Sequence, residues 1–156
     1  MRLTYYSDYS LRVLIYLASG DRDRLVNIKD ISEAYGISKN HLMKIIHNLG
    51  RIGYIETIRG RNGGIRLARL PADINVGEVV RKTEEDFYVV ECFDSAQNQC
   101  VISPVCTLKH VLNEALEQFL KVLDQYTIQD MIPNAGMLQQ YFATAPRKEP
   151  SPESAD

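Results

Sequence analysis

The chain of 156 residues is long enough for one compact unit but too short for most large enzyme scaffolds. Apolar residues make up 45% of it and charged residues 24%, an ordinary globular composition that excludes bulk disorder. The longest apolar run, Val13 to Ala18, is only six residues long, so we expect no transmembrane helix. Because the N-terminus has no apolar signal region, we expect a cytoplasmic protein.

The formal net charge of −2 conceals two halves of opposite charge. Residues 1–69 contain 12 Lys and Arg against 6 Asp and Glu, a net charge of +6, whereas residues 70–156 contain 6 against 14, a net charge of −8. The basic half is therefore suited to a polyanion such as nucleic acid. All three cysteines lie in the acidic half, where an odd, clustered set favours metal or redox chemistry over a disulfide framework.

Hydrophobic periodicity predicts three helices in the basic half, over residues 7–19, 28–35 and about 38–49. Asn27 and Ser38 can cap the second and third helices, and Gly36 can end the second in a left-handed conformation. Two short helices joined by a tight turn at Gly36 and Ile37 are typical of a helix-turn-helix.

Two segments beyond the third helix alternate apolar and polar residues as strands do, Tyr54–Arg59 and Ile65–Ala68. The glycine-rich segment between them contains the pair Asn62-Gly63, whose tolerance of positive φ favours a tight hairpin turn. A basic hairpin in this position would be the wing of a winged helix-turn-helix.

The second helix of a helix-turn-helix enters the major groove, where its N-terminal side chains meet base edges. Lysine can pair with guanine and asparagine with adenine, and an arginine-bearing wing suits a narrow minor groove. The candidate DNA contacts are Ser38, Lys39, Asn40, His41, Lys44 and His47 on the third helix and Arg59, Arg61 and Asn62 on the hairpin. Each alone could be a solvated surface residue, but the set and the basic charge together favour DNA.

A long apolar stripe is predicted in the acidic half. Asn75 can cap a helix over Val76–Thr83, and Ser103 followed by Pro104 is typical of a helix start. From there to about Tyr126, apolar residues recur at helical spacing. A stripe of this length has little of its own core to cover, which favours packing against a second copy of the chain.

Cys92, Cys100 and Cys106 are separated by seven and five residues. Structural zinc sites usually close with two short C-x₂₋₄-C spacings, whereas wide loops around three thiolates suit an iron–sulfur cluster. Cys106 is expected at the third position of the long helix, where the helix terminus lowers the pKa of a thiol and favours the thiolate. The alternatives are three buried small side chains or a redox-sensing dithiol.

An iron–sulfur cluster typically takes four protein ligands, so one is missing from the three cysteines. His110 lies one helical turn beyond Cys106, and the other candidates are the carboxylates of Asp8, Glu91 and Asp94. A carboxylate oxygen is a hard, weakly held ligand for iron in a sulfide environment. It would leave one iron reactive, which suits a sensor.

These elements predict a mainly α fold with a small β-hairpin. Its expected parts are a winged helix-turn-helix DNA-binding domain (1–83), a cysteine-containing cluster-binding loop (84–106), a dimerisation helix with a short following helix (104–130) and a disordered tail (145–156).

The order of elements resembles the Rrf2 family of winged-helix regulators over about residues 1–130. The resemblance is carried by the wing Gly-Arg-Asn-Gly-Gly-Ile-Arg-Leu, the helix Asn-Val-Gly-Glu-Val-Val-Arg and the Cys-x₇-Cys-x₅-Cys loop. Within the family, Leu3 to Arg12 and Val90 to Cys106 resemble a branch of nitric-oxide-sensitive repressors. That branch implies a homodimer with one 4Fe–4S cluster per subunit, held by Cys92, Cys100 and Cys106 and by Asp8 of the other subunit.

The resemblance also implies that the cluster-loaded dimer binds a palindromic operator in double-stranded DNA and releases it in response to nitric oxide. Two alternatives keep the fold: an iron–sulfur homeostasis regulator with a 2Fe–2S cluster, for which His110 is the better ligand, and a metal-free thiol switch. A purely structural interaction module is the remaining alternative. An enzyme is not expected, because the chain has no P-loop, no GxSxG and no acid/base pair.

Overall fold

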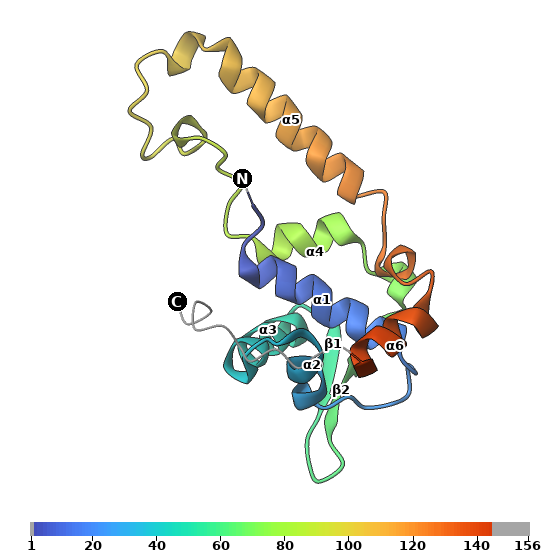
Figure 1. Ribbon diagram of the computed structural model, residues 1–156. Helices are drawn as coiled ribbons and strands as arrows, with labels where there is room; N and C mark the ends of the chain where they lie inside the picture. The colour runs from blue at the N-terminus through green and yellow to red at the C-terminus, as the bar shows by residue number, and fades with distance from the viewer. Residues whose placement is uncertain (1, 145–156) are drawn as a thin grey trace.

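The computed structural model describes residues 2–144, so the tail predicted to be disordered, residues 145–156, lies outside the described part. The helices and strands in chain order are α1 (Tyr5–Ser19), α2 (Ile28–Tyr35), α3 (Lys39–Arg51), β1 (Ile55–Ile58), β2 (Gly64–Leu67), α4 (Val76–Thr83), α5 (Thr107–Leu123) and α6 (Ala135–Thr144). Figure 1 shows a body made of α1 to α4, the hairpin and α6, with α5 standing away from it. None of the helices in this part of the chain is long and apolar enough to cross a bilayer.

Side-chain caps determine where three of the helices begin. The side chains of Asn27, Ser38 and Asn75 accept hydrogen bonds from backbone N–H groups two or three residues later, as expected for α2, α3 and α4. Gly36 ends α2 with φ of 66°, in the left-handed region. The first helix begins two residues earlier than predicted, because the side chain of Thr4 caps it. The predicted helix-turn-helix is therefore confirmed.

The core of the body is centred on α1, which packs against α3 and α4. Apolar side chains from every element of the winged helix-turn-helix are buried here, among them Val13, Leu14, Ile31, Leu42, Ile45, Leu49, Tyr54, Ile65 and Val79. Because the apolar face of α3 is held in this core, its opposite face is turned outward.

The predicted hairpin is confirmed, but its turn is different. Strands β1 and β2 are antiparallel, with Ile58 paired to Gly64, so that five residues connect them. The N–H of Gly63 donates to the carbonyl of Gly60 at 3.0 Å, which closes a turn around Arg61 and Asn62. The positive φ lies at Gly60, at 116°, and not at Asn62. The expected tight Asn62-Gly63 turn is wrong because the connection is too long for a two-residue turn.

The start of the long helix is also corrected. Ser103–Val105 forms a separate 3₁₀ turn, and α5 begins only at Thr107. Cys106 is the residue before the helix, with extended dihedrals of φ −79° and ψ 108°, so the turn does not continue into α5. The expectation that Cys106 is the third helical residue is therefore wrong.

Helix α6 was not expected from the sequence. The Phe142 ring lies 4.8 Å from the ring of Tyr16 on α1 and 5.2 Å from that of Tyr35 on α2, between centroids. Gln139 also donates to the buried hydroxyl of Ser19 at 2.8 Å. These contacts fasten α6 to the helix-turn-helix, although its own sequence has only a weak amphipathic pattern.

Candidate DNA-binding surface and candidate metal ligands

The outward face of α3 carries most of the residues proposed to contact DNA. Lys39, Asn40, Lys44 and His47 are exposed, whereas Leu42, Ile45, Ile46 and Leu49 on the other face are buried. Ser38 and His41 are half-buried, and the Ser38 hydroxyl accepts the capping bond from the His41 N–H at 3.3 Å. Sequence reasoning passed over Met43, an apolar residue that is also exposed on this face.

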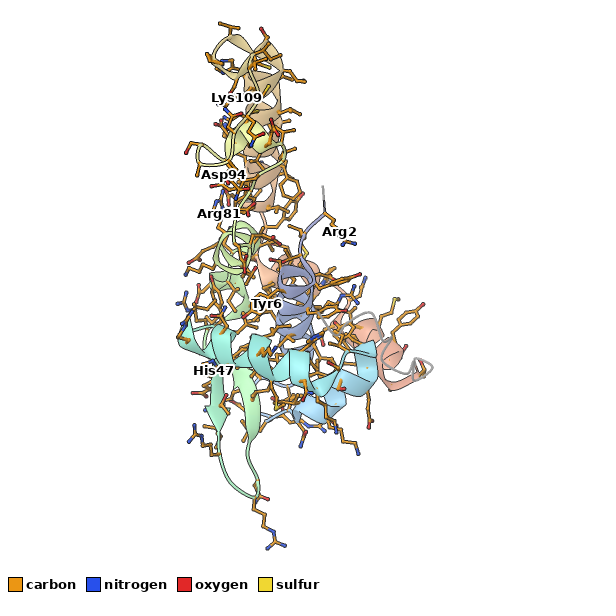
Figure 2. The ribbon with its side chains drawn as sticks, turned by 90° about the vertical axis from the view of Figure 1, so that its left-hand side faces the viewer. Arg2, Tyr6, His47, Arg81, Asp94 and Lys109 are labelled. Carbon is orange, nitrogen blue, oxygen red and sulfur yellow. The ribbon has the colours of Figure 1, made fainter. Side chains whose placement is uncertain are left out.

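The hairpin extends the same surface. Figure 2 shows α3, with His47 labelled, lying across the front of the body and the hairpin projecting beyond it. Arg59, Arg61 and Asn62 are all exposed in its turn. At its base, Arg66 pairs with Glu56 across the two strands, and Arg69 donates to the carbonyl of Gly53 at 2.9 Å. These contacts fix the direction of the hairpin.

The cations of this surface are available to an external anion. Within residues 2–144, the side chains of Lys39, Lys44, Arg59 and Arg61 form no ion pair and no hydrogen bond. Lys29 on α2, in contrast, pairs with Glu33 at 3.6 Å. A phosphate backbone would therefore meet four cations without first displacing a carboxylate.

The three cysteines lie on the segment between α4 and α5. Cys92 is in a 3₁₀ turn over Glu91–Phe93, the Cys100 N–H donates to Asn98 Oδ1 at 3.1 Å, and Cys106 directly precedes α5. All three are free thiols of intermediate exposure. This exposure does not fit three buried small side chains.

The described residues do not form a ready-made metal site. Among residues 2–144 no group of three or more His, Cys, Asp or Glu is gathered closely enough to hold a metal ion. Within the described part of the chain, the hydrogen bonds of residues 85–105 all have both partners inside that segment. The donor chemistry of three free thiols nevertheless fits an iron–sulfur cluster.

Asp8 is engaged elsewhere within its own chain. Arg12, one helical turn later on α1, approaches it with Nη2 2.7 Å from Oδ2, and its Nε donates to Oδ1 at 3.0 Å. The Arg12 guanidinium also lies over the rings of Tyr9 and Tyr35. Burial raises the pKa of Tyr35, whose hydroxyl donates to the Arg12 carbonyl at 3.2 Å. The i,i+4 spacing of Asp8 and Arg12 could have indicated this pair from the sequence.

The remaining ligand candidates lie near Cys92. His110 on α5 lines an open cavity of about 470 Å³ together with Cys92 and Phe93. Glu91 is exposed in the same 3₁₀ turn as Cys92, and Asp94 accepts a hydrogen bond from the Ala96 N–H at 2.9 Å. Within residues 2–144, His110 thus lines the same cavity as Cys92, whereas Asp8 is paired with Arg12.

A helix-turn-helix followed by a basic wing defines the chain as a winged-helix DNA-binding protein. Residues 3–134 match the family model described as "Rrf2: Iron-dependent Transcriptional regulator", and the chain belongs to the Rrf2 family. It is thus a transcriptional regulator and not an enzyme.

Relatives and solved structures agree with this assignment. The chain is 64% identical to the HTH-type transcriptional regulator NsrR of Bacillus licheniformis, over 92% of this chain and 100% of the relative. It is 66% identical to NsrR of Bacillus subtilis, over 86% of this chain and 92% of the relative. The solved structure of T. potens IscR superposes with a TM-score of 0.70 at 27% identity, covering 89% of this chain and 91% of that one.

Proposed function

We propose that the protein is a nitric-oxide-sensing transcriptional repressor, which as an iron–sulfur-loaded homodimer binds a palindromic operator and releases it when nitric oxide is present. The observation that carries the proposal is that, within residues 2–144, one chain presents four cations without a side-chain partner on α3 and the hairpin, and three free thiols on the segment between α4 and α5. Nitric oxide as the signal comes from the resemblance of Leu3 to Arg12 and Val90 to Cys106 to the repressor branch.

The proposed ligands are Cys92, Cys100 and Cys106 of one chain and Asp8 of a second. Three thiolates and one carboxylate would hold a 4Fe–4S cluster with one weakly bound iron, and that iron supplies the reactivity toward nitric oxide. Within one chain Asp8 is bonded to Arg12, so binding iron requires it to exchange this partner or share it.

Support for the dimer comes from α5. None of its residues is buried, and Leu108, Val111 and Val122 are 62%, 54% and 52% exposed. Apolar side chains exposed together on one helix face are typical of a surface that another surface covers. A second copy would cover it and present two copies of α3 to successive major grooves of a palindrome.

A path from Asp8 to the DNA surface runs through α1. This helix carries Asp8 and packs against α3, and it is bonded to α4 by the Ser7 and Thr83 hydroxyls at 2.8 Å. A ligand bond at Asp8 would therefore restrain α1 and, through it, the recognition helix. A hundredfold change in operator affinity requires about 3 kcal/mol of coupling.

The test is anaerobic purification of the full chain, iron and sulfide analysis, and titration of operator binding with nitric oxide. We expect four irons per chain and loss of operator binding as nitric oxide is added. Asp8→Ala should weaken the response, whereas Asp23→Ala, which removes an exposed carboxylate from the α1–α2 connection, should not. Unchanged nitric oxide response and operator affinity in Asp8→Ala would refute the bridging role of Asp8.

One observation favours a second candidate, a regulator with a 2Fe–2S cluster. His110 and Cys92 line the same cavity in a single chain, and histidine is an established ligand of such clusters. Loss of the cluster in His110→Ala, together with two irons per chain, would favour this candidate. Colourless protein without iron or sulfide would instead favour the metal-free thiol switch.

A further inference from the structure

Met43 is an apolar side chain in the middle of the proposed DNA surface. It is 50% exposed on α3. In residues 2–144 most other large apolar side chains with comparable exposure lie on α5, on the segment before it or on α6, and none of the others lies on α3. Dimer formation through α5 therefore does not explain why Met43 is exposed.

The position of Met43 on the helix is well defined. Asn40, Met43, Lys44 and His47 follow the i, i+3, i+4, i+7 spacing of a single helix face, and Lys44 and His47 are also exposed. Leu42 and Ile46, at 0% and 4% exposure, hold the opposite face of α3 in the core, so the helix cannot rotate to hide Met43. If the face carrying Asn40 and His47 enters the major groove, Met43 enters with them.

The major groove offers one apolar feature, the 5-methyl group of thymine. The nitrogen and oxygen groups on its base edges are hydrogen-bond donors or acceptors, which a thioether side chain cannot pair well. Methionine is unbranched and adapts its shape to an irregular apolar partner. We propose that Met43 contacts the 5-methyl group of a thymine in each operator half-site and thereby determines the base read at that position.

This inference rests on the proposed DNA-binding function, and a thymine-to-deoxyuridine exchange tests it directly. Deoxyuridine keeps every hydrogen-bonding group of thymine and lacks only the 5-methyl group. Burial of one methyl group corresponds to about a fourfold change in affinity, so the loss at both half-sites of a dimer should be about fifteenfold.

The experiment begins with the full chain, purified anaerobically, selecting duplexes from a randomised DNA library. Each thymine of the selected site is then replaced singly by deoxyuridine, and affinities are measured at one salt concentration. We expect one thymine position in each half-site to show the fourfold loss. Met43→Ala should bind the thymine and deoxyuridine duplexes equally, whereas Met43→Leu should retain the preference.

Met137→Ala is the matched control, since Met137 is 56% exposed on α6, outside the proposed DNA surface. It should show the wild-type preference, and thermal unfolding should show that all three variants are folded. The inference is overturned if the wild-type chain binds its selected site without regard to any 5-methyl group, or if Met43→Ala keeps the full preference. Absence of any sequence-selective binding would overturn the proposed function, and this inference with it.

Discussion

A buried hydrogen bond between the hydroxyl groups of Ser7 and Thr83 links α1 to α4. Thr83 Oγ1 donates to the Val79 carbonyl at 2.8 Å and lies 2.8 Å from Ser7 Oγ, so the Ser7 hydroxyl donates to Thr83. Both side chains are buried. A buried donor without a partner keeps its full desolvation cost. The effects of substituting the two residues on the free energy of unfolding should therefore be coupled.

We expect Thr83→Val to lower the free energy of unfolding by about 1–2 kcal/mol, because the Ser7 hydroxyl loses its acceptor. Adding Ser7→Ala removes the stranded hydroxyl, so the double variant should be less destabilised than the two single variants predict together. Urea unfolding of the three variants measures this coupling. Strictly additive losses would show that the pair contributes no mutual stabilisation.

At the scale of the element, the hairpin turn depends on a close backbone approach at Gly63. A Cβ at this position would overlap the Ile58 carbonyl oxygen and lie 3.0 Å from the Gly60 carbonyl oxygen. Backbone atoms on both sides cannot yield as a flexible side chain would. A side chain here therefore requires the turn that presents Arg61 to open.

We expect Gly63→Ala to weaken operator binding about tenfold while lowering the free energy of unfolding by only about 1–2 kcal/mol. DNA titration and urea unfolding measure the two effects separately. The control is Gly136→Ala on α6, where a Cβ meets nothing within 4 Å. Equal operator affinity in Gly63→Ala and the wild type would show that the turn geometry is not used.

A second element-scale feature is the junction between α4 and the end of α5. Arg81 donates two hydrogen bonds to Asp124, at 2.5 and 2.8 Å. These hydrogen bonds hold the pKa of Asp124 below its ordinary value of 3.8. A carboxylate with a lowered folded-state pKa stabilises the fold above its unfolded pKa, and that stabilisation is lost as the pH falls through the folded pKa.

We therefore expect the thermal midpoint of the wild type to fall more steeply than that of Asp124→Asn as the pH is lowered from about 4 towards 2, since the variant has no proton to take up at this site. At neutral pH the variant should be slightly less stable, because the pair is largely exposed. Parallel pH profiles would show that the Arg81–Asp124 pair does not contribute to stability.

At the scale of the whole molecule, the body and α5 differ in how their apolar residues are covered. The body has a closed core around α1, whereas α5 extends away from it (Figure 1) and leaves Leu108, Val111 and Val122 exposed. Leu123 near the end of α5 packs against the core, but the exposed side chains of Leu108, Val111 and Val122 can be altered without removing a core contact.

We expect the double variant Val111→Glu, Val122→Glu to be a folded monomer, because both side chains are exposed in the single chain and no core contact is lost. Light scattering after gel filtration measures the mass, and thermal unfolding reports the fold. Lys121→Glu is the control, since it changes the charge by a similar amount on the other face of α5. A double variant that remains a dimer would place the interface elsewhere.

Much of the fold could be predicted from residues close together in the chain. The caps Asn27, Ser38 and Asn75, the left-handed Gly36 and the hydrophobic periodicity act within one or two helical turns, so α2, α3 and α4 follow from local chemistry alone. The residues proposed to contact DNA and iron could also be chosen from the sequence, because the ability of a side chain to donate a hydrogen bond or to bind a metal depends on its residue type.

The position of α6 and the exposure of side chains on α3 and α5 depend on contacts between residues far apart in the chain. Helix α6 depends on Phe142 packing between Tyr16 and Tyr35, more than a hundred positions earlier in the chain, and no local pattern carries that information. The exposure of Met43 follows from which face of α3 the core buries, and the exposure of Val111 and Val122 follows from the direction in which α5 leaves the body. Local sequence thus determined where helices begin and which chemistry they carry, whereas long-range packing decided which side chains face outward, because burial is a property of the assembled core.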